Sequence, residues 1–151
     1  YSDSTIIGFA QMHLSGTGIG DLGDISLMPV AGDVETNRKG LVSRFSHDNE
    51  TVRPGYYSVL LDGSGIRAEM TSTSRVAFHR YTFPDDDRRK FVVIDLEHGI
   101  GWDSPAEGHL QWDGGRVVKG YRISTGWARH QEIFFYAEFF AITQCPPYYP
   151  S

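Results

Sequence analysis

Hydrophobic and polar residues alternate with a period of two along much of the chain, and this pattern predicts β-strands. Residues 66–71 are the clearest case, because apolar Ile66, Ala68 and Met70 are separated by single polar residues. The strands predicted in the same way cover 24–30, 55–61, 76–83, 91–96, 116–123 and 133–140. No segment carries a 3.6-residue apolar stripe over three helical turns. We therefore predict an all-β, antiparallel fold.

Turn-forming residues separate these segments and limit the architecture. Asp62-Gly63 and Asp113-Gly114-Gly115 are expected turns, and we expect Pro29 to end the first strand. Turns that recur about every ten to fifteen residues indicate a β-sandwich rather than βαβ units. Segment 91–96 is apolar on both faces and is predicted to lie centrally, while 133–140 is the most apolar strand and is predicted to be buried. We expect residues 1–151 to form one sandwich domain or a fragment of one.

Composition narrows the function. The chain has 151 residues and a net charge of −5 without a basic block, which argues against a nucleic-acid-binding face. The charge run 85–90 mixes both signs and is predicted to be a solvated turn. The single cysteine, Cys145, excludes an intrachain disulfide, and no apolar run is long enough to span a membrane.

A glycine-rich segment at 13–24 is the most distinctive feature of the sequence. It contains a histidine, two hydroxyl side chains, two carboxylates and four glycines in twelve residues, so it either holds a ligand or turns very tightly. Its Gly18-x-Gly20-x-x-Gly23 pattern formally matches a dinucleotide fingerprint. That motif must open a helix, whereas a strand-like segment follows here, so we reject the nucleotide interpretation.

The sequence leaves two interpretations open for individual residues of this segment. His13 is either a ligand or polyol-binding residue or a locally satisfied structural histidine. Asp21 and Asp24 are either calcium ligands or ordinary turn formers, and the segment alone supplies too few oxygens for calcium.

A second cluster spans Tyr121 to Gln131. Trp127 directly follows Gly126, which suits a ring that stacks on a sugar, with the amide of Gln131 and the guanidinium of Arg122 near enough in sequence to bind hydroxyl groups. The alternative is that Trp127 belongs to the core.

No catalytic or zinc site is evident from spacing. His47, His79 and His98 match no closed zinc pattern and are predicted to be structural, while His109 and His130 are predicted to be exposed. Single carboxylates such as Asp95, Glu97 and Glu138 are available as general acids, but glycoside hydrolysis needs two that face each other, and the sequence places no such pair.

Several stretches together resemble one family. They include Gly8-Phe9-x-x-x-His13-Leu14-Ser15-Gly16-Thr17-Gly18, Gly20-Asp21-x-Gly23-Asp24-Ile25-x-Leu27-Met28-Pro29, Phe45-Ser46-His47-x-Asn49-Glu50, Pro54-Gly55-Tyr56-Tyr57-Ser58-Val59, Ile66-x-Ala68-Glu69, Arg75-x-x-Phe78-His79-Arg80-Tyr81-Thr82-Phe83, Ile94-Asp95-Leu96 and Gly120-Tyr121-Arg122-x-Ser124-x-Gly126-Trp127-Ala128-x-x-Gln131. In this order they resemble the N-terminal domain of family 92 glycoside hydrolases, the calcium-dependent exo-acting α-mannosidases. The stretch 99–113 has no match.

The resemblance implies a two-domain enzyme that hydrolyses terminal α-mannosides with inversion and takes part in N-glycan degradation. A β-sandwich would pack on a C-terminal (α/α)6 barrel, which would carry the catalytic Glu and Asp and most of a Ca²⁺ site. By the resemblance, this chain then holds no catalytic residue and no metal site of its own, and lies outside the cytoplasm. Its expected substrate-binding residues are His13, Ser15, Gly16, Thr17, Asp21, Trp127 and Gln131.

Two other hypotheses remain open. The chain is alternatively a stand-alone carbohydrate-binding β-sandwich that uses the Trp127 cluster without chemistry, or a purely structural sandwich in which the glycine-rich segment is a turn. Because strands are missing at both ends relative to the family, we also expect the chain either to be a fragment of a larger domain or to have its open sheets covered by a partner.

Overall fold

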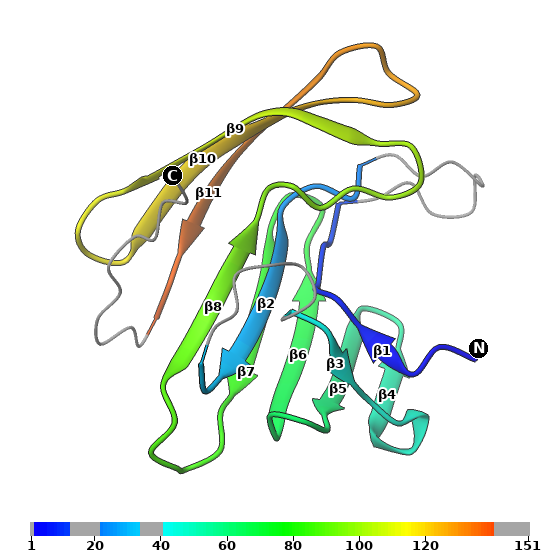
Figure 1. Ribbon diagram of the computed structural model, residues 1–151, viewed down its shortest axis with the longest axis vertical. Coiled ribbons are helices and arrows are strands. Elements are labelled where there is room, and N and C mark those ends of the chain that lie inside the picture. The colour runs from blue at the N-terminus through cyan, green and yellow to red at the C-terminus, as the bar shows by residue number, and fades with distance from the viewer. Residues whose placement is uncertain (1, 13–21, 34–40, 141–151) are drawn as a thin grey trace. The chain divides into compact units, whose positions relative to one another are not determined.

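The computed structural model describes residues 2–12, 22–33 and 41–140, and it folds as two compact units. Unit 1 comprises residues 1–11 and 25–95, and unit 2 comprises residues 12–24 and 96–151. The described elements are β-strands and one 3₁₀ turn, His47–Asn49 (Figure 1). All strand pairs are antiparallel, which confirms the predicted all-β fold and is consistent with a β-sandwich.

Unit 1 is built around a four-stranded meander in which each strand pairs with the next. Its strands are β4 (Glu50–Arg53), β5 (Tyr56–Leu61), β6 (Ile66–Ser72) and β7 (Ala77–Thr82). Two further pairs are formed by β1 (Thr5–Ile6) with β3 (Ser43–Arg44) and by β2 (Ser26–Ala31) with β8 (Lys90–Asp95). The alternation read from 66–71 is confirmed, since the apolar positions of β6 are buried and most of the polar positions between them are not.

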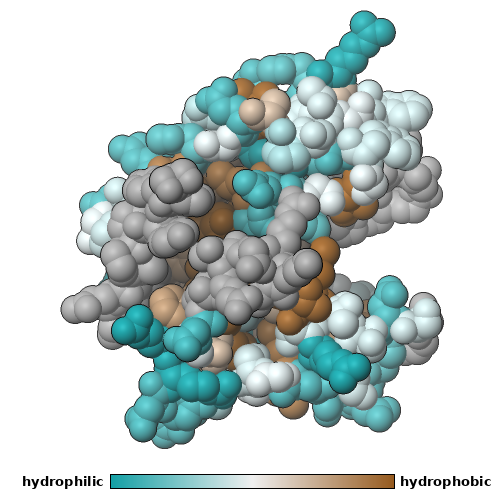
Figure 2. All heavy atoms as spheres, in the orientation of Figure 1, coloured by the Kyte–Doolittle hydropathy of each residue, from teal (hydrophilic) through white to brown (hydrophobic). Residues whose placement is uncertain are grey.

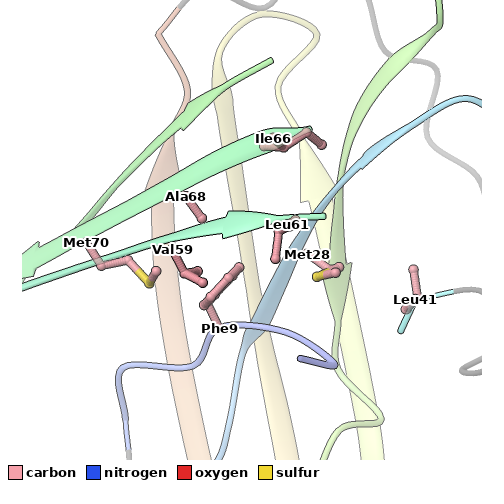
Figure 3. Packing of buried hydrophobic residues seen from close by; sticks show 8 residues of the cluster. All are labelled: Phe9, Met28, Leu41, Val59, Leu61, Ile66, Ala68 and Met70. Carbon is pink, nitrogen blue, oxygen red and sulfur yellow. The ribbon is translucent and has the colours of Figure 1, made fainter. Parts of the chain in front are cut away.

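The hydrophobic core of unit 1 lies against the inner faces of β5 and β6. Val59 and Leu61 are buried on β5, and Figure 3 shows Phe9 and Met28 beside them. The other buried members of the cluster are Leu41, Ile66, Ala68 and Met70. These side chains come from β2, β5, β6 and the segments around Phe9 and Leu41, so their burial ties the segments of unit 1 together through the hydrophobic effect.

The β2–β8 pair corrects two expectations. Pro29 does not end β2, because Leu27 directs its backbone N–H and C=O to Phe9 on the side away from β8, and Pro29 shares that orientation. Its missing N–H therefore costs no bond to β8. Within the part of the chain that the structure describes, β8 pairs with β2 alone, so segment 91–96 does not lie centrally as predicted.

Unit 2 is a curved three-stranded antiparallel ribbon (Figure 1). It consists of β9 (Ser104–Trp112), β10 (Val117–Thr125) and β11 (Gln131–Glu138), with β10 in the middle. A Cβ on Gly120 of β10 would lie 2.3 Å from the carbonyl oxygen of His109, so glycine allows the two strands to approach closely. Strand β9 falls in the stretch that the sequence left unassigned.

The prediction that 133–140 is buried is wrong. Partly buried and exposed residues alternate along β11. Phe134 is 71% exposed, and Phe140, which follows the strand, is 66% exposed. The exposed face of the ribbon also carries Tyr121, whose ring stacks on His109 at 5.6 Å and lies 5.8 Å from Phe134.

The surface of the protein is mainly hydrophilic, with charged residues exposed. On the face drawn in Figure 2, hydrophilic and neutral residues predominate and hydrophobic residues form smaller patches. The charge run 85–90 is exposed, as predicted, and Arg88 bonds Asp86 there. Over the described ranges, no helix is long and apolar enough to cross a membrane.

Candidate sugar-binding site on the β10–β11 turn

A buried ion network lies at the base of the turn between β10 and β11 in unit 2. The side chain of Arg122 is fully buried, and its guanidinium bonds the carboxylates of Asp24 and Asp103. The distance from Nη2 to Asp103 Oδ2 is 2.5 Å, and Nε donates to the carbonyl oxygen of Leu96 at 2.8 Å. All of these groups belong to unit 2.

The charges of this network do not cancel, because one guanidinium serves two carboxylates. Burial raises the pKa of the Asp24 carboxyl above its usual value, although the neighbouring Arg122 counteracts this in part. Burial alone would lower the pKa of Arg122, but hydrogen bonds and charge attraction to Asp103 and Asp24 raise it, so the guanidinium stays protonated.

Amide and hydroxyl groups complete the network. Gln131 is the first residue of β11 and pairs in register with Ser124 of β10. Its Nε2 donates to Asp24 Oδ2 at 2.8 Å and lies 3.4 Å from Ser124 Oγ. The network therefore joins the strand that enters the turn, the strand that leaves it, and Asp24.

The backbone around Asp24 adopts an uncommon conformation. Leu22 has φ 66° and Ile25 has φ 56°, a region that costs energy for a side chain with a Cβ, above all a β-branched one. Between them, a Cβ on Gly23 would lie 2.6 Å from the side chain of Ile100, so only glycine fits without a shift. Such strain persists where the surroundings determine the conformation, and the bonds of Asp24 are part of those surroundings.

The turn itself presents Trp127 to solvent. Gly126 N–H donates to the carbonyl oxygen of Ala128 at 2.9 Å, which closes the turn. Trp127 is 68% exposed, so the interpretation of Trp127 as a core residue is wrong. A flat exposed ring can cover the C–H face of a sugar, and a side-chain amide can bond a hydroxyl group.

The structure places the predicted site residues as follows. His13, Ser15, Gly16, Thr17 and Asp21 lie outside the described residues. Trp127 lies in the β10–β11 turn, and Gln131 begins β11 directly after that turn. Arg122 was expected to bind sugar hydroxyls, and its buried bonds to carboxylates assign it a structural role instead.

Asp103 is the member of the network that sequence reasoning missed. It lies in the unmatched stretch 99–113, and neither its spacing nor its neighbours signal a contact with Arg122. Asp24 was considered as a calcium ligand or a turn former, but its partner Arg122 is 98 residues away in the sequence.

The described residues do not fit a metal centre. Across 2–12, 22–33 and 41–140, no group of three or more His, Cys, Asp or Glu side chains is placed to hold a metal ion. Asp24 and Asp103 bond a guanidinium instead, which supplies a positive charge where a cation would sit. A Ca²⁺ ion of the kind expected from the resemblance would therefore need ligands from elsewhere.

The histidines of unit 1 have structural contacts. Nδ1 of His79 lies 2.6 Å from the hydroxyl of Tyr81, and burial lowers the pKa of His79 to about 4. Nδ1 of His47 lies 2.6 Å from Glu50 Oε2. His109 and His130 are exposed, as predicted.

Comparison with known proteins agrees with this architecture. Residues 1–144 match the family model described as the glycosyl hydrolase family 92 N-terminal domain. The chain is 33% identical over 105 residues to an uncharacterized secreted glycosidase of Arthroderma benhamiae, a match that covers 62% of this chain and 14% of that protein.

Solved structures give the same result. A family GH92 α-mannosidase of Bacteroides thetaiotaomicron superposes with a TM-score of 0.86 at 36% identity, over 91% of this chain and 19% of that protein. An inverting GH92 mannosidase of the same organism superposes with a TM-score of 0.66 at 31% identity, over 80% of this chain and 15% of that protein. The chain thus spans about a fifth or less of these relatives. It belongs to glycosyl hydrolase family 92, and its match is to the N-terminal domain of that family.

Proposed function

We propose that this chain is the sugar-binding part of an α-mannosidase that removes terminal α-linked mannose with inversion. The observation that carries the proposal is an exposed Trp127 on the turn that leads into Gln131, whose amide belongs to a buried ion network, in a chain of family 92. The mannosidase activity named for the related structures supports the substrate class.

In this proposal the chain binds and orients the sugar and supplies neither catalytic carboxylate. The ring of Trp127 covers the apolar face of a mannose residue, and the amide of Gln131 bonds one of its hydroxyl groups. His13, Ser15, Gly16, Thr17 and Asp21 remain the predicted contacts of the glycine-rich segment. A C-terminal (α/α)6 domain of the same polypeptide supplies the general acid, the general base and most ligands of a Ca²⁺ ion.

The proposed setting is outside the cytoplasm, because the similar protein of Arthroderma benhamiae is described as secreted. N-glycans are the substrates that the family resemblance implies. The alternative, a carbohydrate-binding module without catalysis, uses the same Trp127 platform. The two functions differ in whether mannose is released.

Proton NMR of an α-1,2-linked mannobiose incubated with the full-length protein tests the proposal. We expect the mannose released from the non-reducing end to appear first as the β-anomer, because an inverting enzyme lets water attack the face opposite the leaving group. An unchanged disaccharide in the presence of folded protein would contradict the enzymatic function. Binding of the disaccharide without release would support the carbohydrate-binding module.

A further inference from the structure

The side-chain amide of Gln131 has little freedom to choose its hydrogen-bond partners. An amide nitrogen carries two N–H donors. In Gln131 one is directed to Asp24 Oδ2 at 2.8 Å, and the second has Ser124 Oγ within 3.4 Å. Both donors therefore have a partner in the protein, and the capacity left for a ligand is that of the carbonyl oxygen, Oε1.

Asp24 determines which way this amide faces. An ionised carboxylate only accepts hydrogen bonds, so it can face the nitrogen of Gln131 but not its oxygen. Arg122 favours the carboxylate form of Asp24, because its guanidinium is fully buried against Asp24 and Asp103 and opposes the rise that burial causes in the pKa of Asp24. A rotation of the amide by half a turn would bring two acceptor oxygens together and leave an N–H of Gln131 unpaired.

We propose that Asp24, held by Arg122, is a positioning residue that orients Gln131 so that its Oε1 accepts a hydrogen bond from one sugar hydroxyl group. The inference rests on the proposed function, since it specifies how the site recognises a hydroxyl group of the mannoside. The hydroxyl group is recognised as a donor, so a group of the same size that cannot donate is rejected.

Two series of methyl α-mannosides test this reading in the full-length protein. In one series each hydroxyl group is replaced in turn by hydrogen, and in the other by fluorine, which cannot donate. Their inhibition constants are measured against mannobiose hydrolysis, for the wild type and for Gln131→Met. The residue Met is close to Gln in length but lacks the amide.

We expect one ring position at which both replacements weaken inhibition of the wild type about tenfold, the usual effect of one lost hydrogen bond. At that position the two replacements should have little effect on Gln131→Met, because the bond is already absent. A fluorinated ligand that binds as well as the hydroxyl compound, while the deoxy compound does not, would show that Gln131 donates and would overturn the proposal.

Asp24→Asn tests the positioning role. Asparagine can face either end of the Gln131 amide, so the orientation is no longer imposed. We expect the KM for mannobiose to rise about tenfold with kcat changed less than about threefold, and the rejection of the fluorinated ligand to weaken. A KM equal to that of the wild type would overturn the role of Asp24. Glu132→Gln, which alters the neighbouring exposed residue on the other face of β11, is the matched control and should leave the inhibition constants unchanged.

Other outcomes remain decisive. If Asp24→Asn does not fold, the ligand series on the wild type and Gln131→Met decides the orientation of the amide by itself. If the wild type hydrolyses mannobiose and Gln131→Met has the same inhibition constants throughout, this inference fails while the proposed function stands. If the folded wild type neither hydrolyses nor binds any mannoside, the proposed function fails first, and the inference with it.

Discussion

Arg122 and Asp24 are 98 residues apart in the sequence, yet their side chains form an ion pair in which neither is exposed to solvent. The pair connects β10, the middle strand of the β9–β10–β11 ribbon, to the segment that contains Gly23 and Asp24. Removing two charges from water is expensive, so such a pair is better evidence for a defined geometry than for high stability. In this protein the defined geometry is that of the turn that carries Trp127.

The pair predicts a large effect on stability when one partner is removed. Arg122→Met would leave Asp24 and Asp103 buried without a counter-charge, so we expect the free energy of unfolding to fall by about 3–5 kcal/mol. Urea denaturation followed by circular dichroism measures this change. Arg88→Met breaks the exposed pair with Asp86 and is the control, with a much smaller expected loss. Equal losses in the two variants would contradict the buried network.

His79 predicts a pH dependence in unit 1. Its pKa is about 4 in the folded protein, because burial disfavours the charged form, against about 6.5 in the unfolded chain. Between these pH values the unfolded state binds more protons than the folded state. The contribution of His79 to the free energy of unfolding is therefore complete above pH 6.5 and declines as the pH falls towards 4.

Unfolding free energies at several pH values test this linkage. We expect the decline to be shallower in His79→Gln, which cannot take up a proton and keeps a polar group near Tyr81. The difference between the wild type and the variant isolates the contribution of His79 from that of the other histidines. A decline of identical slope in both proteins would show that His79 is not the group responsible.

Removal of calcium is expected to affect the full-length enzyme but not the 151-residue chain by itself. We expect a calcium chelator to stop mannose release by the full-length protein, and added Ca²⁺ to restore it. The thermal midpoint of the 151-residue chain should not change under the same treatment, since its described residues hold no cluster of three or more metal-ligating side chains. A lower midpoint after chelation would place a structural metal site in this chain.

The strands of unit 1 were largely predictable from the sequence. Residues 66–71 bury every second side chain, and this local alternation is visible without knowledge of the fold. Strand β9 was missed because nearly all of its residues are exposed and it contains Pro105 and Gly108, which disfavour strand patterns.

The candidate site was predictable only in part. Trp127 and Gln131 are close in sequence and their residue types suit a sugar, so both could be named in advance. Arg122 was named with them, but its role depends on Asp24 and Asp103, and no local pattern reveals which distant carboxylates meet a buried guanidinium. The strand 133–140 was expected to be buried because its composition is apolar, and its alternating exposure depends on what packs against each face.

The central claim is that this chain binds the mannoside and does not carry the catalytic carboxylates. Steady-state kinetics of the full-length Trp127→Ala variant on α-1,2-mannobiose test it most directly. Trp127 is mostly exposed, so the variant should fold normally, and loss of the stacking ring should raise KM about tenfold with kcat changed by less than about threefold. An unchanged KM, or a kcat reduced about a thousandfold at constant KM, would contradict the claim.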